Sequence, residues 1–227
     1  MSAISPVVLI LGSGPRVGQS VAQAFLAKGY KVAVASRTVK EDSNSKQMSI
    51  ASDLADPENV ASVFAKTKSL LGLPSVVVYN AAAVTRSDAK NPLSLPLADF
   101  SRHLNINTAS AFAAAQQAVL GFSQLPESAS KTFIYTGNIL NTTVMAPMLD
   151  LGVGKSATSH IIQNAASAYA DQGYKFYYAD ERKADGSPAL MDIDGEAHAE
   201  LYVQLAESKS QGPWQQTFVK GIGYKSF

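Results

Sequence analysis

Short, almost continuously apolar segments alternate with longer segments of helical spacing along the whole chain. Such apolar runs are typical of strands whose two faces are both covered by helices. Because parallel strands are joined by right-handed crossovers, this alternation predicts an α/β fold. We expect a doubly wound, mostly parallel sheet of about seven strands with helices on both faces. Ligands of such sheets bind beyond the carboxyl ends of the strands.

The element boundaries follow from apolar periodicity and from capping residues. The predicted strands are Val7–Leu11, Lys31–Ala35, Gln47–Ala51, Ser75–Tyr79, Lys131–Tyr135, Lys175–Ala179 and Thr217–Val219. The predicted helices are Val17–Lys28, Pro57–Leu71, Leu97–Phe122, Gly154–Asp171 and Gly195–Ser208. Asp56 and Pro57 suit the cap and first residue of the second helix. The most polar segment, Lys40–Gln47, is predicted to be a loop.

Composition limits the class of protein. The 227 residues suit one domain, 1–227, and no window is apolar enough to span a bilayer. A formal charge of +1 favours neither nucleic acid nor a membrane as a partner. The chain has no cysteine, and His103, His160 and His198 show no metal-ligand spacing, so no metal site is expected. The apolar run at 7–11 lacks a basic flank, so we expect no signal peptide and a cytoplasmic protein.

The first predicted strand runs directly into a glycine-rich turn, "LGSGPRVG". Gly12, Gly14 and Gly18 lie where that strand gives way to a helix. Glycines at this point let the backbone approach a pyrophosphate at the helix N-terminus. The turn therefore indicates a nucleotide-binding Rossmann fold. The alternative is a tight β–α turn that binds no ligand.

The second predicted strand ends in "ASRT". A site for NAD places an acidic residue here to hold the ribose hydroxyl. Ser36 and Arg37 instead offer a hydroxyl and a guanidinium, which suit a 2′-phosphate, and Arg16 in the glycine turn could join them. These residues favour NADP(H) over NAD(H). The alternative is that the arginines are solvated on the surface.

Up to about Asp180 the chain resembles the short-chain dehydrogenases/reductases. The family's first motif, Thr-Gly-x-x-x-Gly-x-Gly, falls on Leu11–Gly18, with arginine at the middle glycine. The family's acidic residue after the third strand corresponds to Asp53, and its asparagine after the fourth strand corresponds to Asn80. The resemblance implies a cofactor site made of Gly12, Ser13, Gly14, Arg16, Val17, Gly18, Ser36, Arg37, Asp53, Leu54, Asn80, Ala81, Ala82 and Lys155.

The resemblance also implies an incomplete catalytic set. In the family a tyrosine gives a proton to the substrate carbonyl, and a lysine four residues later lowers the pKa of that tyrosine and holds the nicotinamide ribose. Lys155 is at the lysine position, but Leu151 is at the tyrosine position and Asn138 at that of the family's serine. Asn107 matches the catalytic asparagine. The alternatives are a solvated Lys155 and an Asn107 that bonds locally in its helix.

The family's Pro-Gly pair after the sixth strand is replaced by a charged sequence. Asp180, Glu181 and Arg182 should stand at the carboxyl edge of the sheet, near the substrate. One carboxylate could be a substitute acid, or the group could bind a polar substrate, or the segment is only a charged surface loop. Tyr177 and Tyr178 alternate across the strand, so only one can face the site.

Three functions agree with this sequence. The first is an NADP(H)-dependent oxidoreductase of a small molecule with altered proton donation. The second is an NADP(H)-binding sensor or scaffold without turnover. The third is a pocket reused for a reaction such as cyclisation, as in some tyrosine-less members of the family. The small residues of the central helix and of Gly154–Asp171, two helices that form a dimer interface in the family, imply a homodimer or homotetramer. Packing inside one subunit is the alternative.

Overall fold

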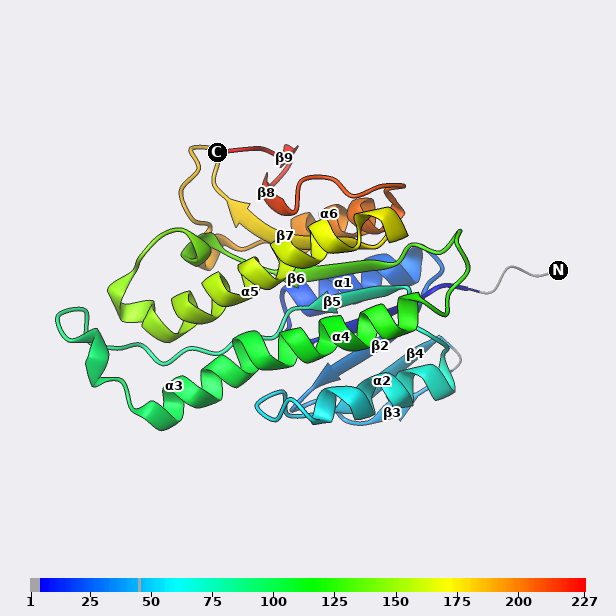
Figure 1. Cartoon of the computed structure of the whole chain (residues 1–227), viewed down its shortest axis with the longest axis horizontal. Coiled ribbons are helices and arrows are strands. Elements are labelled where there is room, and N and C mark those ends of the chain that lie inside the picture. Colours follow the sequence, from blue (N-terminus) through cyan, green and yellow to red (C-terminus); the bar gives the residue numbers. More distant parts are fainter. Residues whose placement is uncertain (1–4, 45) are drawn as a thin grey trace.

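The strand order shows how the chain is wound. The computed structural model describes residues 5–44 and 46–227. Within them, nine strands form one sheet in the order β3-β4-β2-β1-β5-β6-β7-β8-β9 (Figure 1). They are β1 (Val7–Leu11), β2 (Lys31–Ser36), β3 (Asp42–Ser43), β4 (Gln47–Ala51), β5 (Val76–Tyr79), β6 (Thr132–Thr136), β7 (Lys175–Arg182), β8 (Gln215–Val219) and β9 (Gly223–Tyr224). The chain winds outward from β1 in both directions, which confirms the doubly wound sheet.

The seven predicted strands correspond to β1, β2 and β4 to β8, and all of them are parallel. Two further strands lie at the edges. β3 pairs antiparallel with β4, and β9 pairs antiparallel with β8. The prediction that Lys40–Gln47 is only a loop was therefore wrong at Asp42 and Ser43. Two polar residues at a sheet edge have no apolar alternation to reveal them.

Helices cover both faces of the sheet. One face packs against α1 and α6, and the other packs against α2, α4 and α5 (Figure 1). The helices are α1 (Val17–Ala27), α2 (Asn59–Leu70), α3 (Leu97–Leu104), α4 (Ser110–Phe122), α5 (Leu149–Ala168) and α6 (Gly195–Glu207). In β1, Val8 and Ile10 join the core under α1, while Leu9 and Leu11 join the core under α4. Because both faces are buried, the strand is apolar at every position.

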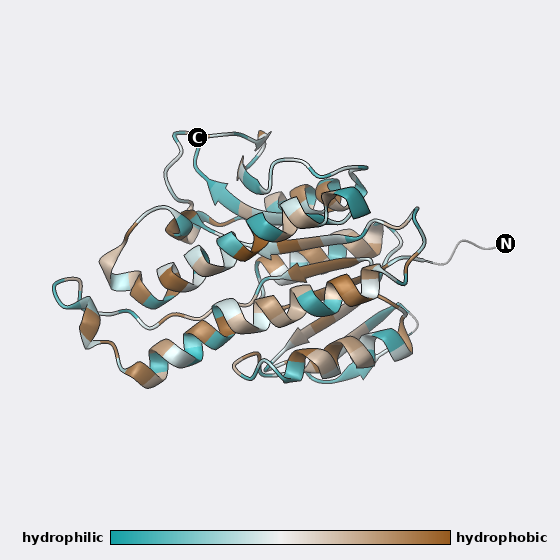
Figure 2. Ribbon diagram, in the orientation of Figure 1, coloured by the Kyte–Doolittle hydropathy of each residue, from teal (hydrophilic) through white to brown (hydrophobic). Residues whose placement is uncertain are grey.

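The hydropathy of the ribbon marks a polar segment in the interior. The central strands are mostly hydrophobic, but the arrowhead end of β7 is hydrophilic (Figure 2). It carries Asp180, Glu181 and Arg182, which are all buried. Charged residues are rarely buried without partners, so this end of β7 is a candidate for chemistry.

The predicted helix Leu97–Phe122 is interrupted. It consists of α3, a π-helical turn over Asn105–Ala109, and α4. Asn107 lies in the π-helical turn and is fully buried. A single π turn changes the helical period only locally, so the sequence pattern could not show it.

Two helix starts differ from the prediction. α5 begins at Leu149 instead of Gly154, so Leu151 and Lys155 belong to one helix. The glycines at 152 and 154 weakened the helical pattern, and tertiary packing overrides their low propensity. α2 begins at Asn59, with Glu58 as its cap, so the prediction that Pro57 is its first residue was wrong.

The described part of the chain also bears on two other features, membrane-spanning helices and metal sites. None of their helices is long and apolar enough to cross a membrane. In this part of the chain no three His, Asp or Glu side chains gather where they could hold a metal ion. His103, His160 and His198 lie on α3, α5 and α6.

Candidate functional site

The glycine turn after β1 is locked to the loop after β5. Gly12 has a φ of 101°, and a Cβ atom there would collide with the backbone of Ala81. The Asn80 side chain donates a hydrogen bond of 2.7 Å to the carbonyl of Gly12. The amides of Asn80 and Ala81 both donate to the carbonyl of Leu11. Only glycine fits at position 12, because of both this close approach and its positive φ.

A crevice of about 290 Å³ opens beyond the carboxyl ends of β1, β2, β4 and β5. This is the point where the winding of the sheet reverses, and ligands of doubly wound sheets bind there. The crevice brings together the predicted residues Gly12, Ser13, Gly14, Ser36, Arg37, Asp53, Leu54, Asn80, Ala81 and Ala82. It is also lined by four residues that the sequence reasoning missed: Pro15, Thr38, Ser52 and Ile106. Pro15, Thr38 and Ser52 adjoin predicted residues, and this adjacency was the only signal for them.

The crevice has polar groups without partners. The hydroxyl oxygens of Ser36 and Ser52 are buried and have no hydrogen-bond partner within residues 5–44 and 46–227. A Cβ atom added to Gly14 would meet no atom of the described chain within 4 Å. Buried polar atoms normally have partners, so these features fit a bound polar group.

Asp53 is held as an anion at one end of the crevice. One of its carboxylate oxygens accepts a hydrogen bond of 3.0 Å from the amide of Ala55, and the other lies 3.4 Å from Arg102. These contacts, with the Ala55 amide first and Arg102 and Arg37 after it, lower the pKa of Asp53. The carboxylate can therefore accept a hydrogen bond from an amino group of a ligand.

Four predicted cofactor residues do not line this crevice: Arg16, Val17, Gly18 and Lys155. The guanidinium of Arg16 donates to the carbonyl of Met191, at 3.2 Å, and so lies against the turn before α6. In this structure Arg16 therefore does not lie with Ser36 and Arg37, and its role in cofactor binding stays a prediction. Val17 and Gly18 begin α1, and Gly18 allows that helix to pack on the glycine turn.

Both ends of the Asn107 side-chain amide and its backbone carbonyl are hydrogen-bonded inside the protein. Its side chain exchanges hydrogen bonds of 3.0 and 2.8 Å with the backbone of Ala83. Its carbonyl accepts from the hydroxyls of Tyr135 and Thr158 at 2.9 and 2.8 Å. The residue therefore fixes the loop after β5 against the π-helical turn.

Asn138 and Leu151 occupy the positions that the resemblance gives to a serine and a tyrosine. Asn138 begins a short turn, where its side chain accepts a hydrogen bond from the amide of Leu140. Its backbone exchanges two hydrogen bonds with the hydroxyl of Tyr178. Leu151 is buried in the first turn of α5. Neither side chain can give up a proton at neutral pH.

Lys155 lies one turn after Leu151 and is only 3% exposed. Its ammonium donates a hydrogen bond of 2.7 Å to the carbonyl of Thr136 and lies 4.4 Å from the ring centre of Tyr135. Burial lowers the pKa of Lys155 to about 7, against the opposing effect of the Asp180 charge. The alternative of a solvated surface lysine was therefore wrong.

The charged end of β7 divides between the two faces of the sheet. Asp180 faces α5 and bonds through one oxygen to Arg182, at 2.6 Å. Its other oxygen is buried and, in the described part of the chain, has no partner. Glu181 faces α6, where it accepts from the amide of Asp194 and lies 3.4 Å from His198. Of the two carboxylates, Asp180 is on the side of Lys155. The alternative of a surface loop was wrong, because all three charged residues are buried in β7.

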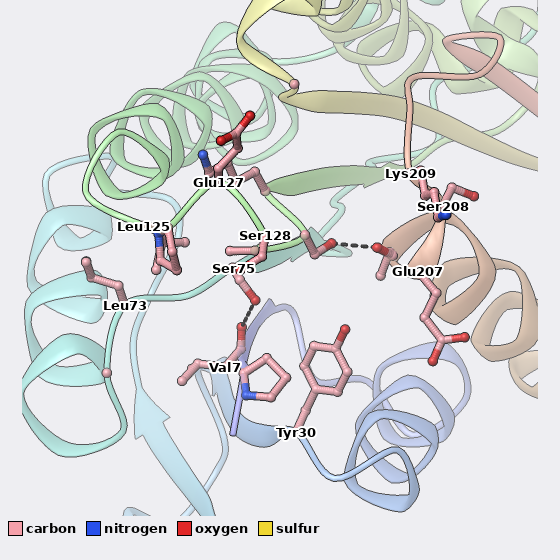
Figure 3. A pocket seen from close by; sticks show the side chains of 18 of the residues that line it. Val7, Tyr30, Leu73, Ser75, Leu125, Glu127, Ser128, Glu207, Ser208 and Lys209 are labelled. Carbon is pink, nitrogen blue, oxygen red and sulfur yellow. Dashed lines mark hydrogen bonds between the residues drawn. The ribbon is translucent and has the colours of Figure 1, made fainter. Parts of the chain in front are cut away.

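A larger hollow lies at the other end of the strands, by their amino ends (Figure 3). Its volume is about 980 Å³, and Tyr30, Ser75, Glu207 and Lys209 are among its lining residues. It contains none of the predicted cofactor or catalytic residues. The amino ends of parallel strands also lack the ligand-binding geometry of the carboxyl ends. We therefore assign the site to the smaller crevice and to the group around Lys155.

Known proteins resemble this chain in sequence and in fold. A sequence model described as Enoyl-(Acyl carrier protein) reductase matches residues 15–178. The chain is 47% identical to the short chain dehydrogenase/reductase dmxR12 of Cryptosporiopsis sp. (strain 8999), covering 98% of this chain and 95% of that protein. In fold, it resembles NADH-dependent reductase A1-R′ complexed with NAD, with a TM-score of 0.78 at 15% identity over 95% and 94% of the two chains. It also resembles BdcA in complex with NADPH, with a TM-score of 0.72 at 20% identity over 98% and 96%.

The family match begins at Pro15, so it includes Gly18 of the glycine turn but not Gly12 or Gly14. It also includes Asn80, Asn107 and Lys155. The match to dmxR12 extends over almost the whole length of both proteins. The chain therefore belongs to the short-chain dehydrogenase/reductase family of NAD(P)-binding oxidoreductases.

Proposed function

We propose that this protein is an NADP(H)-dependent oxidoreductase that acts on a carbonyl group of a small molecule. The observation that carries the proposal is the pair of unpartnered hydroxyls, Ser36 and Ser52, in a crevice that Arg37 also lines. A hydroxyl and a guanidinium at the end of β2 suit a 2′-phosphate, whereas the ribose of NAD would favour an acidic residue there.

The residues of the crevice suit the other parts of the same cofactor. The backbone of Gly12 to Gly14 would approach the pyrophosphate at the N-terminus of α1. Asp53 would accept from the adenine amino group, and the ammonium of Lys155 would hold the nicotinamide ribose. When bound, the nicotinamide supplies the hydride, and the protein's part is to orient the groups and manage the proton.

A second candidate is cofactor binding without redox turnover, or a reaction such as cyclisation in the same pocket. It is favoured by Leu151, which fills the tyrosine position with a buried aliphatic side chain. It is also favoured by Asn138, whose amide oxygen is already used as a cap for Leu140. We prefer the oxidoreductase because a buried lysine with a lowered pKa remains in the group.

The test combines binding and turnover. Fluorescence titration should give tighter binding of NADPH than of NADH, and NADPH consumption should follow addition of one of a panel of aldehydes, ketones, imines and enones. Tight NADPH binding without consumption on any of them would favour the second candidate. Equal affinity for both cofactors would overturn the choice of NADP(H).

A further inference from the structure

Lys155 and Asp180 come near the same part of the sheet because β6 and β7 are in register. Thr136 of β6 is paired with Ala179 of β7, and Asp180 follows immediately. The ammonium of Lys155 is bonded to the carbonyl of Thr136, and the charge of Asp180 acts on it. Both side chains are buried, at 3% and 0% exposure.

Each of the two groups has unused hydrogen-bonding capacity. The Lys155 ammonium has three N–H groups, and its hydrogen bond within the described residues is the one to Thr136. Arg182 binds one oxygen of Asp180 through both Nε and Nη2. The second Asp180 oxygen has no partner in residues 5–44 and 46–227, although it is buried. An unsatisfied buried carboxylate oxygen is costly unless it serves another group.

The other groups around Lys155 are neutral near pH 7. Tyr135 from β6 lies under the ammonium, and Tyr178 from β7 stacks on Tyr135. Burial raises the pKa of both phenols above the ordinary value. From α5 itself, Leu151 contributes no charge. The charged groups facing the ammonium from β7 are therefore Asp180 and its partner Arg182.

We propose that Lys155 is itself the proton donor of this protein and that Asp180 is the positioning residue that keeps its ammonium charged. This inference rests on the oxidoreductase function proposed above. In the proton step, one N–H bond of Lys155 breaks as an O–H bond forms on the substrate oxygen, while the hydride comes from the reduced cofactor. Lys155 is left neutral and regains its proton from solvent.

Proton donation by Lys155 would replace that of the tyrosine, whose position Leu151 occupies. A general acid works best when its pKa lies near the working pH, and burial brings lysines into this range. The pKa of Lys155 is lowered to about 7 and so lies near a neutral working pH. Glu181 cannot share the role, since it faces α6 and is bonded to the amide of Asp194.

Two variants of Lys155 separate proton donation from cofactor holding. Lys155→Arg keeps a charge and its hydrogen bonds but cannot release a proton at neutral pH. We expect it to bind NADPH within about threefold of the wild type and to lose carbonyl reduction by roughly 100-fold or more. Lys155→Met should lose both the binding of NADPH and the reduction of carbonyls. Reduction that survives in Lys155→Arg would overturn the proposal.

A second measurement needs no substrate. In protein labelled with ¹³C at the lysine Cε, the signal that disappears in Lys155→Arg should titrate near pH 7. The midpoint of this titration should move to lower pH in Asp180→Asn, because the nearby negative charge is removed. Glu181→Gln, the neighbouring carboxylate on the other face, is the matched control and should leave the titration unchanged. Lys175, a second buried lysine, should also remain unchanged.

These outcomes distinguish the two proposals. If NADPH does not bind, the proposed function fails, and the proposal for Lys155 as its proton donor falls with it whatever the titration gives. If Lys155 titrates near its ordinary value, the donor role is overturned even when NADPH is consumed. If Asp180→Asn does not fold, the titration of the wild type and the turnover of Lys155→Arg still decide the donor role, because neither depends on that variant.

Discussion

Asn107 and Gly154 pack against each other with no side chain between them. A Cβ atom added to Gly154 would lie 2.5 Å from the Cβ atom of Asn107. Asn107 has little freedom to withdraw, because its carbonyl accepts from Tyr135 and Thr158. This contact holds the π-helical turn against α5 and sets the position of Lys155, the next residue.

Replacing Gly154 by alanine should therefore destabilise the protein. Alanine is the better helix former, but in this buried contact the added methyl forces a shift, and overpacking typically costs about 1–3 kcal/mol. The free energy of unfolding, measured by urea denaturation, should fall. The matched control is Gly152→Ala in the same helix, where the nearest atom to an added Cβ is the Leu140 carbonyl at 4.0 Å. That variant should gain up to about 1 kcal/mol from helix propensity. Equal effects at both positions would contradict this account.

The cofactor crevice predicts different roles for two nearby arginines. Arg37→Ala should weaken NADPH binding by about 1–3 kcal/mol, as for a lost charged hydrogen bond, and leave NADH binding unchanged. Arg16→Ala is the control, since Arg16 bonds to the carbonyl of Met191 and does not line the crevice. It should not change the ratio of the two affinities. Fluorescence titration of both cofactors measures this ratio, and a larger change in Arg16→Ala would reverse the assignment.

Most of the fold was predictable because burial on both faces leaves a direct record in the sequence. The strands around β1 are apolar at successive positions, and glycine at position 12 marks a backbone approach that no other residue allows. Ten of the predicted cofactor residues consequently lie in one crevice. They follow the ends of strands whose positions the apolar pattern defines.

The remaining features depend on contacts between distant segments. The burial of Asp180 needs the register of β6 with β7 and the pairing with Arg182, neither of which a one-dimensional pattern contains. The direction of Arg16 depends on the turn at Met191, 175 residues away. Gly154, predicted to begin α5, instead lies inside that helix and packs on Asn107. Local propensity is a weak guide where tertiary contacts decide.

Lys175 predicts how stability changes with pH. It is 2% exposed at the start of β7, and its ammonium donates to the carbonyls of Leu205, Ala206 and Ser208. Burial lowers its pKa from 10.5 to about 8. Between these values the unfolded chain holds more protons at this residue than the folded protein does. Its contribution to the free energy of unfolding therefore rises with pH in that window and is constant below pH 8.

The test compares wild type with Lys175→Met by urea denaturation at pH 7.5 and 9.5. The wild type should show a larger increase, or a smaller decrease, in the free energy of unfolding between the two values. Other titrating groups, including Lys155, are common to both proteins and cancel in the comparison. An identical pH dependence would show that the pKa of Lys175 is not lowered in the folded protein.

The exposed apolar residues of α4 and α5 predict assembly. Phe112 and Leu120 on α4 are 47% and 58% exposed, and Val153 on α5 is 38% exposed. A symmetric homodimer or tetramer would cover them. Light scattering should give a multiple of 24 kDa, and Phe112→Glu should shift the mass toward 24 kDa. Val144 lies in a loop and is 94% exposed. Val144→Glu is therefore the control and should not change the mass. A 24 kDa wild-type particle at micromolar concentration would contradict assembly.

Restoring the family's proton donor tests whether acid catalysis alone has diverged. In Leu151→Tyr with Asn138→Ser, a phenol would stand one turn before Lys155, whose charge lowers the pKa of a nearby tyrosine. Proton donation is typically worth about 10²–10⁴ in rate, so the double variant should reduce carbonyls faster than the wild type with NADPH. The matched control, Leu151→Phe with Asn138→Ser, has the ring without the hydroxyl and should show no gain. A double variant that folds and binds NADPH without any gain would mean that the substrate pocket itself has changed. That result would favour binding or cyclisation over carbonyl reduction.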